Sequence, residues 1–227
     1  KNFLLSIDTK KIKYGLARTK KMLEACNNPH KRIQSIQVVG TNGKGTTCAM
    51  LTHVLVQNNY KVGLFTSPHL VEINERISVN FNNIPDSFIQ SFINKYQEQI
   101  DNIKPSFFEI MTVLSIYYFD YMKVDFAILE TGLGGRLDSV TAIKSPIVIF
   151  TSISYDHMSI LGNTLELIAK EKIGALTDKT EIICSVKQPK SIKNIFESRA
   201  AKQGKKIHFS PTSNSSMLKL KYLKGSH

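Results

Sequence analysis

Residues 37–47 read Gln-Val-Val-Gly-Thr-Asn-Gly-Lys-Gly-Thr-Thr, and this stretch decides the fold of the chain. Val38 and Val39 indicate the end of a short buried strand, which meets a glycine loop at Gly40. After the loop, apolar residues at helical spacing predict a helix over residues 46–57. A strand, a glycine-rich loop and a helix in this order indicate an α/β protein with a ligand site at the loop.

The rest of the chain continues this alternation of strands and helices. We expect further strands at 61–66, 124–129, 146–151 and 181–185. We expect further helices at 10–26, 85–100, 106–122, 164–176 and 191–203. The pattern predicts a mainly parallel sheet flanked by helices. No internal repeat or Pro/Gly-rich linker interrupts it, so we interpret residues 1–227 as one α/β domain.

The glycine loop has the chemistry of a phosphate site. Its glycines let main-chain N–H groups turn inward, and the helix that follows adds a partial positive charge. The spacing differs from that of the common P-loop, because a glycine separates the lysine from the hydroxyl residues. A glycine-rich turn without a ligand is the alternative, but the lysine and the two threonines favour an ATP triphosphate site. We assign to this site Asn42, Gly43, Lys44, Gly45 and Thr46.

Three other polar side chains follow predicted strands, and these are Ser67, Glu130 and His157. The carboxyl ends of parallel strands meet at one edge of a sheet, so we expect these groups near the glycine loop. A carboxylate at the end of an apolar strand is a usual ligand of Mg²⁺ beside a nucleotide. Taken alone, Ser67 is equally well explained as part of a Ser-Pro turn, and a lone histidine is more often a packed or surface residue.

Two further segments favour substrate binding. Residues 130–138 read Glu-Thr-Gly-Leu-Gly-Gly-Arg-Leu-Asp, and the glycines permit a close approach of the loop to a ligand. Arg136 can neutralise a phosphate or pair with Asp138, although a solvated loop is the alternative. The predicted helix 106–122 begins with Ser106 and two phenylalanines, of which Phe108 is a candidate wall for a flat heterocycle. Core packing explains the phenylalanines equally well.

Composition and charge exclude several classes of protein. The 227 residues are 42% hydrophobic and 21% charged, which is ordinary globular usage and excludes a wholly disordered chain. The net charge is +12, but residues 33–186 hold 11 basic and 15 acidic side chains, so the excess lies at the two ends. We therefore expect no nucleic-acid partner. We also expect no membrane span, and three scattered cysteines favour a reducing cytoplasm.

Together the motifs resemble the folylpolyglutamate synthase/dihydrofolate synthase family, a branch of the Mur-ligase-like enzymes that form amides with ATP. The segments that carry the resemblance are GTNGKGTT at 40–47, TSPHLVEINER at 66–76, ETGLGGRLD at 130–138, and YDHMSILG at 155–162 followed by Glu171-Lys172. The first segment is common to the superfamily, and the second and third are specific to the folate branch. The resemblance implies the central, P-loop-like domain of a Mur ligase.

The resemblance also implies roles for single residues. Ser67, Glu130 and His157 would hold magnesium, and Lys44 would bind the ATP phosphates. The residues implied to be catalytic are Lys44, Lys172 and His157. Lys172 matches the family lysine that carries a carbamate, which would turn a repelling ammonium group into an anionic metal ligand. The substrate-binding positions implied for the folate are Ser106, Phe108, Arg136 and Asp138.

The implied reaction joins L-glutamate to dihydropteroate, to tetrahydrofolate or to both, through an acyl phosphate, with release of ADP and phosphate. Two alternatives remain, a Mur-type ligase of cell-wall peptide precursors and a non-catalytic nucleotide-binding module. Family members are about twice as long as this chain, and residues 223–227 resemble the opening of a family helix motif. We therefore expect a truncated, monomeric ATP-binding domain, inactive alone, that lacks a carboxy-terminal glutamate-binding domain.

Overall fold

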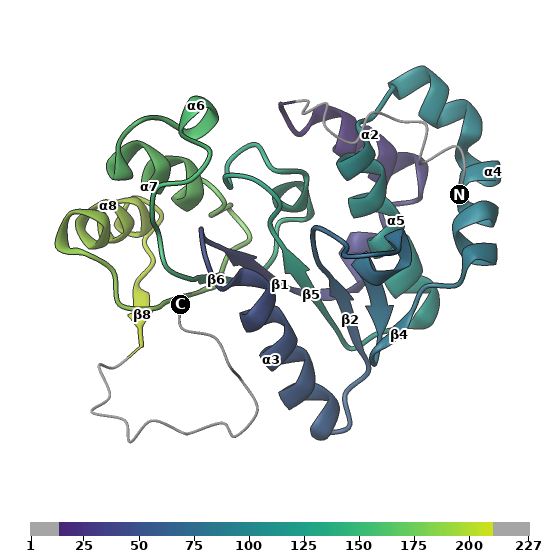
Figure 1. The fold of residues 1–227 in the computed structure, drawn as a ribbon, viewed down its shortest axis with the longest axis horizontal. Coiled ribbons are helices and arrows are strands. Elements are labelled where there is room, and N and C mark those ends of the chain that lie inside the picture. The colour runs from purple at the N-terminus through teal and green to yellow at the C-terminus, as the bar shows by residue number, and fades with distance from the viewer. Residues whose placement is uncertain (1–13, 211–227) are drawn as a thin grey trace.

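The computed structural model describes residues 14–210, which form one eight-stranded sheet with helices on both faces (Figure 1). The strand order is β4-β3-β2-β5-β1-β6-β7-β8. Neighbouring strands are parallel except in the pairs β2–β3 and β3–β4, which are antiparallel. The fold class predicted from the sequence is confirmed.

The elements have the following bounds. The strands are β1 (Gln34–Val39), β2 (Val62–Phe65), β3 (Ile77–Val79), β4 (Asn82–Asn83), β5 (Phe126–Glu130), β6 (Ile147–Phe150), β7 (Ile182–Ser185) and β8 (Ile207–Phe209). The α-helices are α2 (Ala17–Ala25), α3 (Lys44–Gln57), α4 (Asp86–Ile103), α5 (Phe107–Met122), α6 (Met158–Leu161), α7 (Leu165–Ile173) and α8 (Lys190–Ala201). The 3₁₀ helices are η1 (Pro29–Arg32), η2 (Ile73–Arg76) and η3 (Ser139–Ile143).

The central strands bury apolar side chains on both faces of the sheet. Alternate residues of β1 and β5, such as Val38 and Ile128, pack under α3. On the opposite face Leu129 joins the core made with α2, α4 and α5, and Val39 joins the core made with α7 and α8. Helix α5 is buried along most of its length, as its apolar sequence predicts. This double coverage fixes the carboxyl ends of β1 and β5.

The structure differs from the sequence-based expectations in several elements. The strand order was not predicted: β5 lies between β1 and β2, so the strand that leads to Ser67 does not neighbour the strand of the glycine loop. The antiparallel strands β3 and β4, the edge strand β8 and the short helix α6 were not predicted. Residues 10–13 of the first predicted helix and the motif at 223–227 lie outside the described residues.

Two further observations concern the chain between residues 14 and 210. None of its helices is both long and apolar enough to cross a membrane. Its three cysteines, Cys26, Cys48 and Cys184, are free thiols.

Candidate active site

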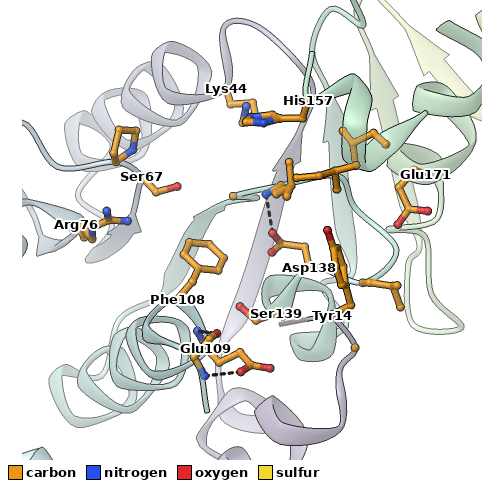
Figure 2. Close-up of a pocket in the computed structure, with 18 residues that line it drawn as sticks. Tyr14, Lys44, Ser67, Arg76, Phe108, Glu109, Asp138, Ser139, His157 and Glu171 are labelled. Carbon is orange, nitrogen blue, oxygen red and sulfur yellow. Dashed lines mark hydrogen bonds between the residues drawn. The ribbon is translucent and has the colours of Figure 1, made fainter. Parts of the chain in front are cut away.

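A cavity of about 510 Å³ lies beyond the carboxyl ends of the central strands (Figure 2). It extends from the start of α3 to the start of α5. Six of the side chains predicted from the sequence line it, namely Lys44, Ser67, Ser106, Phe108, Asp138 and His157. The sheet therefore brings together groups that are more than 100 residues apart in the sequence, as the topology of parallel strands requires.

The glycine loop has the backbone of a strand-to-helix cradle. A Cβ atom on Gly40 would lie 1.8 Å from Oγ1 of Thr151, so no side chain fits there. Gly43 has a φ of +79° and immediately precedes α3, whose first residue is Lys44. The Lys44 ammonium group donates to the Thr41 main-chain oxygen at 3.1 Å. The partial positive charge of the helix N-terminus and the charge of Lys44 are therefore close together, and both favour binding of an anion.

The other predicted residues of the loop do not line the cavity. Asn42 donates from its side-chain amide to the hydroxyl oxygen of Ser154 at 3.0 Å, which holds the loop to the segment after β6. Gly43, Gly45 and Thr46 follow on the turn and in the first turn of α3. Only Lys44 of the loop reaches the cavity wall.

Glu130 and Ser67 meet beside the loop. The Ser67 main-chain N–H donates to Oε2 of Glu130 at 3.1 Å, and a Cβ on Gly45 would lie 3.7 Å from both carboxylate oxygens. Glu130 is buried, and burial raises the pKa of its carboxyl group, against the opposing effects of the Ser67 N–H and the charges of Lys44 and Arg76. Because β5 lies between β1 and β2, Glu130 at the end of β5 is placed between Lys44 and Ser67.

Of the three predicted magnesium ligands, Ser67 and Glu130 are in contact with each other, and His157 lines the same cavity as Ser67. His157 has a left-handed backbone (φ 45°) before α6, and its Nε2 lies 3.5 Å from Oδ1 of Asp156. Residues 14–210 contain no group of three or more His, Cys, Asp or Glu side chains that could hold a metal by themselves. Mg²⁺ usually takes one or two carboxylates and completes its shell with phosphate and water oxygens. The Glu130 carboxylate and the Ser67 hydroxyl are donors of this kind.

Lys172, on α7, reaches the base of the glycine loop. Its Nζ donates to the Gly40 main-chain oxygen at 2.7 Å, and the residue is 2% exposed. Burial, and next the charge of Lys44, lower the pKa of Lys172 to about 8. A Cβ on Gly135 would lie 2.5 Å from the Lys172 main-chain oxygen, so the loop 130–138 packs directly on this lysine.

The far wall of the cavity is aromatic. The Phe108 ring covers Gly132, where a Cβ would lie 2.5 Å from the ring, and its centroid lies 5.6 Å from that of Phe65. Phe107 is buried in the core instead. Ser106 caps α5, since its hydroxyl oxygen accepts the Glu109 N–H at 3.3 Å. The two phenylalanines therefore differ in role: Phe108 forms part of the cavity wall, and Phe107 packs in the core.

Asp138 and Arg136 do not pair with each other, which corrects one sequence-based expectation. The Asp138 carboxylate accepts the main-chain N–H groups of Leu133 at 2.8 Å and Val140 at 2.9 Å. Burial raises its pKa to about 6. Arg136 instead donates to Glu171 at 3.0 Å, and its half-exposed side chain does not line the cavity. Two adjacent N–H donors satisfy the aspartate, so it needs no arginine.

Three charged side chains that line the cavity, Arg76, Glu109 and Glu171, have no role in the sequence-based predictions. Arg76 is 8% exposed and donates to Nδ1 of His69 at 2.8 Å. Glu109 is 2% exposed, and its Oε2 accepts the Ser106 N–H at 2.6 Å and the Arg18 side chain at 3.0 Å. Arg76 lies in the segment 66–76 and Glu109 in the predicted helix 106–122, but only the fold shows that both are buried and face a cavity.

Comparison with known proteins gives a consistent result. The family described as Mur ligase middle domain matches residues 38–226. The dihydrofolate synthase/folylpolyglutamate synthase of Bacillus subtilis is 41% identical over 191 residues, which cover 81% of this chain and 44% of that protein. The dihydrofolate synthetase of Saccharomyces cerevisiae is 38% identical over 172 residues, covering 74% and 40%.

Solved structures show the same similarity. A structure described as an FPGS–AMPPCP–folate complex has a TM-score of 0.83 and 29% identity, over 92% of this chain and 52% of that one. Folylpolyglutamate synthase of Mycobacterium tuberculosis, complexed with ADP, has a TM-score of 0.83 and 25% identity, over 92% and 48%. The chain spans less than half the length of the two curated relatives named above.

Proposed function

The chain belongs to the Mur ligase family, and we propose that it forms the ATP-binding part of a ligase that adds L-glutamate to folates. The acceptor carboxylate is that of dihydropteroate, of tetrahydrofolate or of both. The observation that carries the proposal is the single cavity with Lys44 at one end and the Phe108–Gly132 wall at the other. A phosphate cradle and a slot for a flat ring within one cavity suit the transfer of a phosphoryl group to a carboxylate on a heterocyclic substrate.

The protein's part in this reaction is positioning and charge stabilisation. ATP gives its γ-phosphoryl group to the substrate carboxylate, and the amino group of glutamate then displaces phosphate from the acyl phosphate to form the amide. Lys44, at the N-terminus of α3, offsets the negative charge of the phosphoryl group in transfer. Ser67, Glu130 and His157 would hold magnesium, which supplies further neutralisation of phosphate charge.

Lys172 is proposed to carry a carbamate. A pKa of about 8 leaves a larger fraction of neutral amine at pH 7 than an ordinary lysine has. The neutral amine can attack CO₂ to form an N–C bond, with its proton released to solvent. The product is anionic, so it removes the repulsion between the ammonium groups of Lys172 and Lys44 that contributes to the lowered pKa.

The remaining parts of the proposal concern the whole protein. A carboxy-terminal domain would bind glutamate and close over the nucleotide, as the sequence resemblance implies. The reaction takes place in the cytoplasm of the cell with small molecules as the only ligands, and the free thiols agree with a reducing compartment.

The test uses the natural full-length protein with ATP, L-glutamate and one acceptor at a time. Dihydropteroate, tetrahydrofolate and a cell-wall peptide precursor are compared by ADP release and by the mass of the product. We expect a gain of one glutamate on at least one of the two pteridine acceptors, and loss of that product in Lys44→Ala. Turnover of the peptide precursor alone would support a Mur-type peptide ligase, and nucleotide binding without turnover of any acceptor would support a binding module.

A further inference from the structure

A second cavity, of about 690 Å³, lies at the opposite edge of the sheet from the glycine loop. Its lining includes Pro146, just before β6, and Glu181, just before β7, so it is at the amino ends of these strands. The end of α2, the turn into η1 and the end of η3 complete it. The proposed ligase reaction takes place at the carboxyl ends and leaves this cavity without a role.

The charged groups of this cavity are mainly cationic. Four lysines line it against two glutamates, and the lysines are Lys20, Lys31, Lys144 and Lys179. Lys144 is paired with Asp178 at 3.0 Å. The other three ammonium groups make no ion pair or hydrogen bond with the described residues. These three lysines, which have no such partner among residues 14–210, outnumber the lining glutamates Glu24 and Glu181, and the excess of positive charge attracts an anion.

His30 adds a fixed polar group to the lysines. Its Nδ1 is buried without a hydrogen-bond partner among the described residues, and the residue lines the cavity. Burial lowers the pKa of His30, and the charges of Lys31 and Arg32 lower it further. The protonation of the imidazole therefore depends on the positive charges next to it.

The floor of the cavity is apolar. Leu23, Ala142 and Ile143 are 1%, 4% and 4% exposed and face the same space as the lysines. An apolar floor with a few polar groups around it is the usual composition of a small-molecule site. The flexible ammonium groups suit phosphate or carboxylate oxygens as point charges rather than a fixed bidentate geometry.

We propose that this second cavity is a binding site for a small organic anion that carries two or more negative charges, as phosphate or carboxylate groups on an apolar body. Lys20, Lys31 and Lys179 bind the charged groups, His30 donates from Nε2, and Leu23 with Ile143 contacts the apolar part. The site is separate from the ATP site and does not depend on the proposed ligase function.

The experiment follows the ¹³C-labelled histidine side chains of the full-length protein by NMR, with His30→Gln to assign the His30 signal. Pyrophosphate and citrate are titrated separately at low ionic strength. Anion binding next to the imidazole is expected to shift the His30 signal saturably and to raise its pKa. A response to both probes supports a site that selects charge, and a response to one supports a site that selects phosphate or carboxylate.

Two variants separate a site from a generally basic surface. Lys31→Gln/Lys179→Gln is expected to weaken binding by about tenfold, since each lysine supplies a charge-assisted contact. The matched control, Lys187→Gln/Lys190→Gln, removes the same charge at exposed positions beyond the other end of β7 and is expected to leave the affinity within about twofold. The proposal is overturned if the wild-type His30 signal does not move with either probe, or if both double variants lose affinity equally.

Discussion

The Lys172 ammonium group, on α7, donates a 2.7 Å hydrogen bond to the main-chain oxygen of Gly40, 132 positions earlier in the chain. This bond ties the helix that follows β6 to the loop that follows β1. Burial lowers the pKa of this lysine to about 8, so its protonated and neutral forms have similar free energies near that pH. Its titration therefore provides a direct test of the site.

The stability of the folded protein is expected to depend on pH through Lys172. Its folded pKa is about 8 and its ordinary value is 10.5, so between these values the unfolded chain binds more protons. The free energy of unfolding then rises with pH across this window. We expect the wild type to gain stability relative to Lys172→Met between pH 8 and 10, measured by urea unfolding in CO₂-free buffer. The control is Lys170→Met, which removes an exposed lysine from the same helix. Parallel curves for Lys172→Met and wild type would contradict the assignment.

Gly135→Ala is expected to destabilise the protein and displace Lys172. The new Cβ would lie 2.5 Å from the Lys172 main-chain oxygen and 2.9 Å from its Cα, so backbone must move. We expect a loss of about 1–3 kcal/mol in the free energy of unfolding, together with loss of ligase activity.

Gly45→Ala is the matched control for that change. Its Cβ would meet only the Glu130 carboxylate, at an ordinary 3.7 Å, and the position is in a helix. Stability should stay the same or rise by up to about 1 kcal/mol, because alanine favours the helix. Equal destabilisation of the two variants in thermal or urea unfolding would show that Gly135 has no special packing role.

Phe108→Ala is expected to weaken the pteridine substrate and not the nucleotide. The ring forms the cavity wall over Gly132, so its removal should raise the KM for the pteridine substrate about tenfold, equivalent to about 1.4 kcal/mol. ADP affinity, measured by calorimetry, should stay within about twofold. The control is Phe107→Leu in the core, which should cost roughly 1 kcal/mol of stability and leave this KM unchanged. A raised KM in Phe107→Leu with an unchanged KM in Phe108→Ala would instead place Phe107 in the substrate site.

Glu130→Gln is expected to reduce the effect of magnesium on nucleotide affinity. In the wild type, removal of magnesium with EDTA should weaken AMPPCP binding. In the variant this effect should shrink by at least about tenfold, because the carboxylate ligand is gone while the amide oxygen can still accept the Ser67 N–H. Glu98→Gln, an exposed change, is the control.

The same variant has an expected effect on stability. Burial raises the folded pKa of Glu130, so the folded chain binds more protons than the unfolded chain just above pH 4.5, and stability falls as pH rises there. The glutamine side chain introduced by Glu130→Gln does not titrate, so at pH 7 this variant should be at least as stable as the wild type. The measurement is the free energy of unfolding of both proteins at pH 4 and pH 7. A larger deficit of the variant against wild type at pH 7 than at pH 4 would contradict this expectation.

The parallel part of the fold could be predicted from the sequence because it follows from local patterns. Apolar runs such as 126–129 end at polar residues, and the glycine loop marks one strand-to-helix junction. The β3–β4 hairpin could not be predicted in this way. Its turn uses Asn80 and Phe81 at φ values of 45° and 68°, and phenylalanine gives no turn signal at a position that usually holds glycine.

The site could be predicted in its residue types but not in its pairings. Lys44, Ser67, Glu130 and Lys172 were all named from motifs, and the fold brings each to the glycine loop. The pairing of Arg136 depends on α7 approaching the loop 130–138, which is a contact between distant segments and leaves no local pattern in the sequence. The order of the strands likewise depends on contacts between distant segments, so it could not be predicted from local patterns.

The position of β5 between β2 and β1 has a consequence for how the protein opens. Glu130 ends β5, Ser67 follows β2 and Lys44 follows β1. These three adjacent strands are joined by main-chain hydrogen bonds at the centre of the sheet. Fraying that begins at β8 or α8 leaves these three strands intact. Amide hydrogens of β1 and β5 should therefore exchange with deuterium only on global unfolding, and those of β8 much sooner.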